Sequence, residues 1–150
     1  MKMKKVVALL CGSMMACSSV GFATIPSEKI GIGKVVPGMT VADLQNAYGQ
    51  PNQKIGDNWY YSNFKVEVDK KDMPQYVNEV ESRNTSLGTP GGVTIGQDAS
   101  VLNYAYGPAD VVRTDNGVDE YHYFNGNYSK KMKFTVLNQV IVKISCETID

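Results

Sequence analysis

The chain has 150 residues, of which 43% are hydrophobic, and its 15 lysines and arginines balance its 15 aspartates and glutamates. This length suits one compact domain or two very small ones that share a core. There is no basic stripe of the kind that binds phosphate backbones, so nucleic acid is excluded as the expected partner.

The first residues have the layout of a secretory leader. Met1–Lys5 contains three lysines and no acid, Val6–Cys17 is an almost unbroken apolar run, and small residues lead to Gly21-Phe22-Ala23. The apolar run is shorter than the roughly 20 residues that a transmembrane helix needs. We therefore interpret residues 1–23 as a signal peptide cleaved after Ala23, which leaves a mildly acidic mature chain.

An alternative interpretation of the leader anchors the protein to a membrane. Met14-Met15-Ala16-Cys17 resembles a lipoprotein signal with methionine where leucine is usual, and lipidation would make Cys17 the first residue. We expect an exported protein, periplasmic or secreted, and alternatively an outer-membrane lipoprotein anchored at Cys17. A membrane is a partner only in the second case.

Cysteine usage argues against a disulfide-stabilised fold. Two of the three cysteines, Cys11 and Cys17, lie in the leader. The mature chain is left with Cys146 and forms no intramolecular disulfide. We interpret Cys146 as a small residue of the last strand, because a reactive thiol needs an electropositive neighbourhood.

An internal repeat organises the rest of the chain. Residues 38–51 read GMTVADLQNAYGQP and residues 96–108 read GQDASVLNYAYGP, with glycine, leucine, alanine and tyrosine recurring at a constant offset. Further downstream, residues 57–63 align with residues 119–125. Ser82–Gly92, between the copies, has the Ser, Thr, Gly and Pro content of a linker.

Each copy is expected to begin with a short helix. Thr40 with Asp43 resembles a capping box, and Asp98 is the N-cap candidate of the second copy. Gly49 and Gly107 stand where a left-handed C-cap is needed, and a proline soon follows each. Tyr48 and Tyr106 fall on the apolar faces of these helices and are interpreted as core residues.

Three antiparallel strands are expected after each helix. Segments rich in aromatic and β-branched residues alternate with period two, which is typical of strands with one buried face. Asn116-Gly117 is a strong hairpin signal and Asn138-Gln139 a weaker one.

The predicted fold class is α+β, with two tandem repeats, each a short helix followed by antiparallel strands, and the helices packed on one face of the sheet. The first repeat spans residues 24–84 and the second residues 85–150. A unit this small does not bury its apolar face alone, so we expect the two to share a continuous sheet or a common core and to fold as one cooperative unit.

The motifs carry a family resemblance over nearly the whole mature chain. GMT, a short helix, YGxP, an aromatic strand with WxY and a closing VxxV/I strand resemble the repeat of the SmpA/OmlA outer-membrane-assembly lipoproteins. They also resemble the tandem repeat of secreted β-lactamase-inhibitory proteins. The resemblance implies helices against one face of an antiparallel sheet, and binding of other proteins through the open face and its loops.

Strand alternation assigns the candidate binding residues. If Trp59 and Phe134 point to the helices, their strand neighbours point to the open face. Exposed aromatic side chains ringed by polar residues are typical of protein-binding anchors. In the alternative interpretation they pack on the linker or on each other. The candidates on this face and on the loop from Asp69 to Gln75 are Tyr60, Lys65, Glu67, Asp69, Asp72, Met73, His122 and Phe124.

The sequence thus predicts a non-catalytic protein-binding module of the bacterial envelope that needs no cofactor and no metal. The alternative is a secreted inhibitor that blocks an enzyme with a loop, and a small enzyme comes third. Nothing in the sequence places His122 beside Cys146 or supplies a third group to orient such a pair. Asp115–Glu120 is oxygen-rich but lacks the spacing of a calcium loop.

Overall fold

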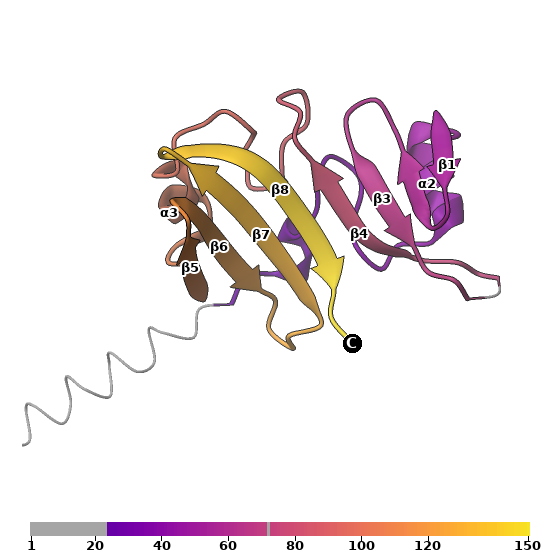
Figure 1. The fold of residues 1–150 in the computed structure, drawn as a ribbon. Helices are drawn as coiled ribbons and strands as arrows, with labels where there is room; N and C mark the ends of the chain where they lie inside the picture. The colour runs from indigo at the N-terminus through magenta and orange to yellow at the C-terminus, as the bar shows by residue number, and fades with distance from the viewer. Residues whose placement is uncertain (1–23, 72) are drawn as a thin grey trace, which may run out of the picture.

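A single antiparallel sheet of eight strands forms the body of the molecule (Figure 1). The computed structural model describes residues 24–71 and 73–150. The signal peptide of residues 1–23, its cleavage after Ala23, the lipidation of Cys17, and Asp72 all lie outside the described residues. The strands are β1 (Gln53–Ile55), β2 (Asn58–Tyr60), β3 (Lys65–Val68), β4 (Val77–Ser82), β5 (Val111–Asp115), β6 (Val118–Phe124), β7 (Lys130–Leu137) and β8 (Val140–Thr148).

Helical structure in the described residues is confined to three short segments. These are the 3-10 turn η1 (Ser27–Lys29) and the helices α2 (Val41–Tyr48) and α3 (Val101–Tyr106), of 8 and 6 residues. Helices this short depend on tertiary packing for their stability. They add side chains to the core without forming a layer that matches the sheet.

The predicted α+β class of two helix-plus-strand repeats is therefore wrong, because one continuous sheet dominates the fold. The order β1-β2-β3-β4-β8-β7-β6-β5 joins both halves of the chain through β4 and β8. The prediction also missed β1 and β5. Their side chains are almost all exposed and show no alternation of burial, so the period-two pattern does not mark them as strands.

The predicted turns and most of the predicted helix ends are confirmed. Asn116-Gly117 and Asn138-Gln139 adopt positive φ angles at both positions, as tight hairpin turns require. The Thr40 hydroxyl accepts a hydrogen bond from the Asp43 N–H at 3.1 Å. Asp98 is not the N-cap of α3, because Ser100 holds that position.

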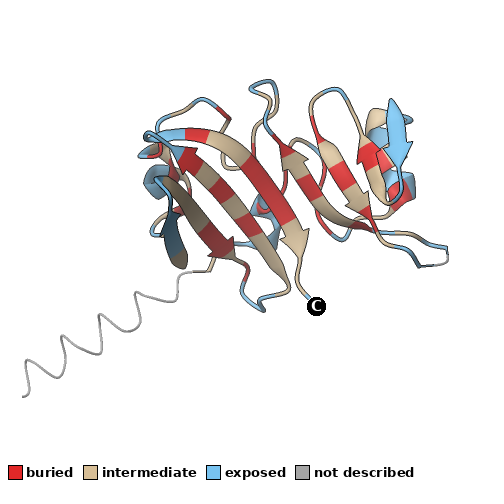
Figure 2. Cartoon of the chain, viewed as in Figure 1, coloured by how far each residue is buried: buried red, intermediate tan, exposed pale blue. Residues whose placement is uncertain are grey.

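The core lies on one face of the sheet, and burial alternates along β3 and most of β7 (Figure 2). Leu44 of α2 and Leu102 of α3 join it and are 0% and 1% exposed. The segment before α2 also contributes buried residues, which the sequence analysis did not anticipate. These are Ile25, Ile30, Ile32 and Val35.

Tyr48 and Tyr106, the tyrosines expected on the apolar helix faces, are structural. The Tyr48 hydroxyl accepts a hydrogen bond from the Lys34 N–H at 2.9 Å. The Tyr106 hydroxyl accepts one from the Gly91 N–H at 3.1 Å and donates to Thr89 Oγ1 at 2.6 Å. Each helix is thereby tied to the loop that precedes it.

Candidate functional site

The face of the sheet opposite the core carries two rows of side chains that run across both halves of the molecule, and we call it the open face. Because side chains alternate along each strand, every second residue of β2 to β8 points to it. The strand registers order the first row as Tyr60, Lys65, Glu81, Ser145, Lys133 and His122. The second row is Glu67, Glu79, Glu147, Lys131 and Phe124.

The predicted residues Tyr60, Lys65 and Glu67 lie together at one end of this face, each half-buried. Phe124 lies at the other end, on β6. Five strand spacings separate β2 from β6, which is roughly 24 Å at the usual spacing. Tyr60 and Phe124 therefore do not form one aromatic cluster.

Phe124 already has an aromatic neighbour. Its ring lies 5.6 Å from that of Tyr128, measured between centroids. This contact agrees with the alternative interpretation, in which the aromatic side chain packs within the molecule.

The prediction that His122 is exposed is wrong, since His122 is only 7% exposed. His122 lies between Val111 on β5 and Lys133 on β7, and the stems of long charged side chains cover such interior positions. Its Nε2 atom is 3.8 Å from the Glu120 carboxylate, too far for a hydrogen bond. Burial and then the Lys131 ammonium lower the pKa of the imidazole, so His122 is neutral near pH 7.

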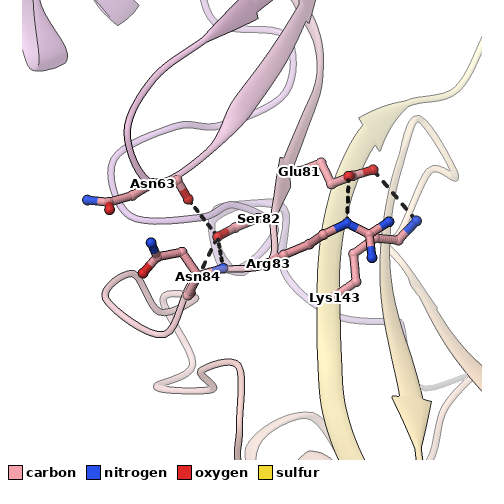
Figure 3. A network of polar contacts seen from close by, with 6 residues as sticks. All are labelled: Asn63, Glu81, Ser82, Arg83, Asn84 and Lys143. Atoms are coloured by element: carbon pink, nitrogen blue, oxygen red, sulfur yellow. Dashed lines mark hydrogen bonds and ion pairs between the residues drawn. The ribbon is translucent and has the colours of Figure 1, made fainter.

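A hollow of about 320 Å³ opens at the Tyr60 end of the open face. Tyr60, Lys65 and Glu81 line it with the turn after β2 and the segment after β4. The Glu81 carboxylate lies 3.5 Å from Arg83 Nε and 3.6 Å from Lys143 Nζ (Figure 3). One carboxylate thus joins the hollow to β8 of the other half.

The wall of this hollow is held by hydrogen bonds of the Ser82 side chain to the backbone and by one aromatic contact. The buried Ser82 hydroxyl donates to the Asn63 carbonyl at 2.8 Å and accepts from the Asn84 N–H at 3.1 Å (Figure 3). The ring of Tyr61 stacks on that of Phe64 at 4.7 Å. Both ends of the wall are therefore tied to neighbouring segments of the chain.

Most of the charged side chains in the two rows were not among the predicted candidates. Glu79, Glu81 and Glu147 lie on β4 and β8. Their position beside Lys65 and Glu67 follows from the strand order, which the sequence does not display.

The loop between β3 and β4 follows Val68, at the end of β3 that carries Glu67. Asp69 has a structural role, because its carboxylate accepts a hydrogen bond from the Tyr76 N–H at 3.2 Å. Met73 is 86% exposed, and Asp72 is outside the described residues. The loop is therefore separate from the hollow at Tyr60, at the opposite end of β3.

The arrangement offers no support for the catalytic alternatives. Cys146 is fully buried opposite Val80 and Met132, and burial raises the pKa of its thiol. His122 lies on the other face of the sheet, so the two side chains do not meet. In the described part of the chain, no three His, Cys, Asp or Glu side chains are arranged to hold a metal ion.

No protein-family model and no curated protein matches the chain. Among solved structures, a DUF4309 family protein (YjgB) from Bacillus subtilis is similar, with a TM-score of 0.50 and 18% identity over 88% of this chain and 92% of that one. A cysteine-rich secretory protein (SAV1118) from Staphylococcus aureus has a TM-score of 0.52 and 12% identity over 84% of this chain and 49% of that one. The fold is shared.

These similarities concern the fold and carry no activity to this chain. The chain spans about half the length of the staphylococcal protein. The resemblance to the SmpA/OmlA and β-lactamase-inhibitory repeats stays a prediction. Within residues 24–71 and 73–150, no helix has the length and apolar character needed to cross a membrane.

Three glutamates follow one another in the second row of the open face. Glu67 lies opposite Glu79, and Glu79 lies opposite Glu147. Like charges directly opposite each other destabilise a sheet. Burial first, and then the Glu147 carboxylate, raises the pKa of Glu79, while the Lys65 ammonium partly offsets the shift.

Glu79→Gln is expected to increase the free energy of unfolding at pH 7 by less than about 1 kcal/mol. Because the pKa of Glu79 is higher in the folded than in the unfolded state, the stability it contributes is present below the unfolded pKa. That stability is lost as the pH rises through the folded pKa. Urea denaturation of both proteins at about pH 4 and pH 7 measures the effect.

The matched control is Glu28→Gln in the exposed turn η1, which removes the same charge away from the row. A Glu79→Gln protein less stable than the wild type at pH 7 would show that the glutamate row is not repulsive.

Proposed function

We propose that the protein is an exported, non-catalytic module of the bacterial envelope that captures another protein on the Tyr60 end of its open face. The observation that carries the proposal is the hollow lined by Tyr60, Lys65 and Glu81. It offers the ring of Tyr60, a residue type that is enriched in binding hot spots, with charged side chains beside it that suit the polar rim of an interface.

The Tyr60 end is favoured over the Phe124 end because its aromatic side chain is available. Phe124 packs on Tyr128 and His122 is buried, whereas Tyr60 borders the hollow. A partner that seats an apolar group on Tyr60 can also pair its own charges with Lys65 and Glu81.

Export rests on two supports. The first five residues are basic, and an apolar run and small residues follow them. The similar staphylococcal structure is described as a secretory protein. Periplasmic and secreted locations remain parts of this proposal, with anchoring at Cys17 as the alternative.

Tyr60→Ala and Lys65→Glu should each weaken partner capture by at least about tenfold, the effect of one hot-spot contact. The measurement uses a photo-crosslinking amino acid at Ser62, an exposed residue of the hollow. A discrete adduct should form in the native cell and should be lost when Tyr60→Ala is added.

The matched control places the same crosslinker at Tyr104, which is 90% exposed on α3. Equal adducts from both positions would indicate nonspecific contact. An adduct at Ser62 that survives both substitutions would move the binding site away from the hollow.

A second candidate function is inhibition of an enzyme by the loop after β3. It is favoured by Met73, a large apolar side chain that is 86% exposed and that an enzyme pocket could accept. Replacing residues 69–75 by a two-residue turn would abolish inhibition but leave the Ser62 adduct intact, so the two functions are separable.

A further inference from the structure

Strand β5 leaves one end of the sheet without a neighbour. Among the described strands it pairs with β6 alone. All of its residues after Val111 are exposed, and Val112 is 53% exposed. An edge of this kind is a template for another strand unless the fold blocks it.

The hairpin geometry determines which backbone groups of β5 face outward. Asn116 and Gly117 both have positive φ, at 50° and 77°, so Asp115 and Val118 close a two-residue turn as a hydrogen-bonded pair. Hydrogen-bonded pairs alternate along an antiparallel ribbon. The N–H and C=O groups of Val112 and Thr114 therefore point away from the sheet.

The other edge of the sheet is less suited to pairing. Strand β1 spans the 3 residues Gln53–Ile55 and begins soon after Pro51. Its Lys54 side chain lies over the Trp59 ring, 3.8 Å from the centroid. The two edges therefore differ in length, and the longer one is open.

The charges of β5 are complementary to those of a second copy of the same strand. Arg113 and Asp115 point to the open face, on either side of Thr114. In an antiparallel pair with Thr114 opposite Thr114, each Arg113 faces Asp115 of the other copy. A shift that places Arg113 opposite Arg113 is disfavoured by repulsion.

We propose that two copies of the protein associate through β5 about a twofold axis, in the register that pairs Arg113 with Asp115. The result is one continuous sheet with eight strands from each copy. A twofold axis makes the contact self-complementary and closes the assembly at a dimer. On the core side the two Thr114 side chains meet, and each Val112 lies opposite Asn116 of the other copy.

The test is sedimentation of the exported protein over a range of concentrations. The wild type should form a concentration-dependent dimer. Arg113→Asp and Asp115→Arg each place like charges opposite one another, so each should raise the dimer dissociation constant at least about tenfold. The double variant exchanges the charges and should restore the wild-type value.

Thermal melts of the four proteins separate loss of folding from loss of pairing. Thr114→Pro adds a test of the backbone contact, because the Thr114 N–H points outward to the second copy and an edge strand accepts proline at such a position. This variant should also raise the dimer dissociation constant. A wild type that stays monomeric at about millimolar concentration overturns the proposal, as does a dimer that is unaffected by both single variants. Partner capture at Tyr60 is a separate property, so either result leaves it standing.

Discussion

Phe134→Ala is expected to lower the free energy of unfolding by about 3–5 kcal/mol. The Phe134 side chain is 0% exposed, and its ring lies 5.8 Å from that of Tyr106 and 5.9 Å from that of Tyr123. Removing it opens a cavity between α3 and β6 that rigid aromatic neighbours do not fill. Urea denaturation measures the change, provided that the slope with denaturant stays constant.

Thr135→Ala is the matched control, because Thr135 is the next residue on β7 and points to the open face. The Thr135→Ala substitution should lower the free energy of unfolding by less than about 1 kcal/mol. Similar losses from both variants would mean that the sheet is covered equally on its two faces, and the open face would have to be reassigned.

Residues 24–84 and 85–150, produced separately, are expected to lack a cooperative unfolding transition. Each half loses the pairing of β4 with β8, which joins Val80 to Cys146 across the middle of the sheet. Each also exposes core residues that it cannot cover. The remaining burial does not offset the conformational entropy of a chain this short.

The N-terminal segment makes the division less favourable still. The Ile25 N–H donates to the Phe124 carbonyl at 2.9 Å, and Asn125 Nδ2 donates to Ser27 Oγ at 2.9 Å. A cut at residue 84 therefore removes from the second half a segment that packs on it. Folding of the two halves as one cooperative unit stays a prediction, which the separate fragments test.

Circular dichroism and thermal melts of each fragment and of their mixture test this expectation. The mixture should regain a cooperative transition, since both sides of the β4–β8 pairing are then present. Two sharp independent transitions from the separate halves would show instead that the chain holds two domains.

The features predicted correctly from the sequence are local ones. The capping hydroxyl of Thr40, the turn at Asn116-Gly117 and the burial of Phe134 each depend on a few neighbouring residues. The alternation of apolar side chains assigned one face to the core and placed Tyr60, Lys65 and Glu67 on the other. These residues of the candidate site were therefore accessible without a structure.

The strand order was decided by the tertiary structure. Exposed strands such as β5 have no apolar period, so their pairing depends on hairpin contacts that the pattern does not report. The joining of β4 to β8 pairs residues more than 60 positions apart, and no local signal encodes it. That pairing decided how the two halves join into one sheet, and it placed Glu81 beside Lys143 of the second half. The burial of His122 has the same origin, because a strand residue is covered or exposed according to the neighbours that the whole sheet supplies.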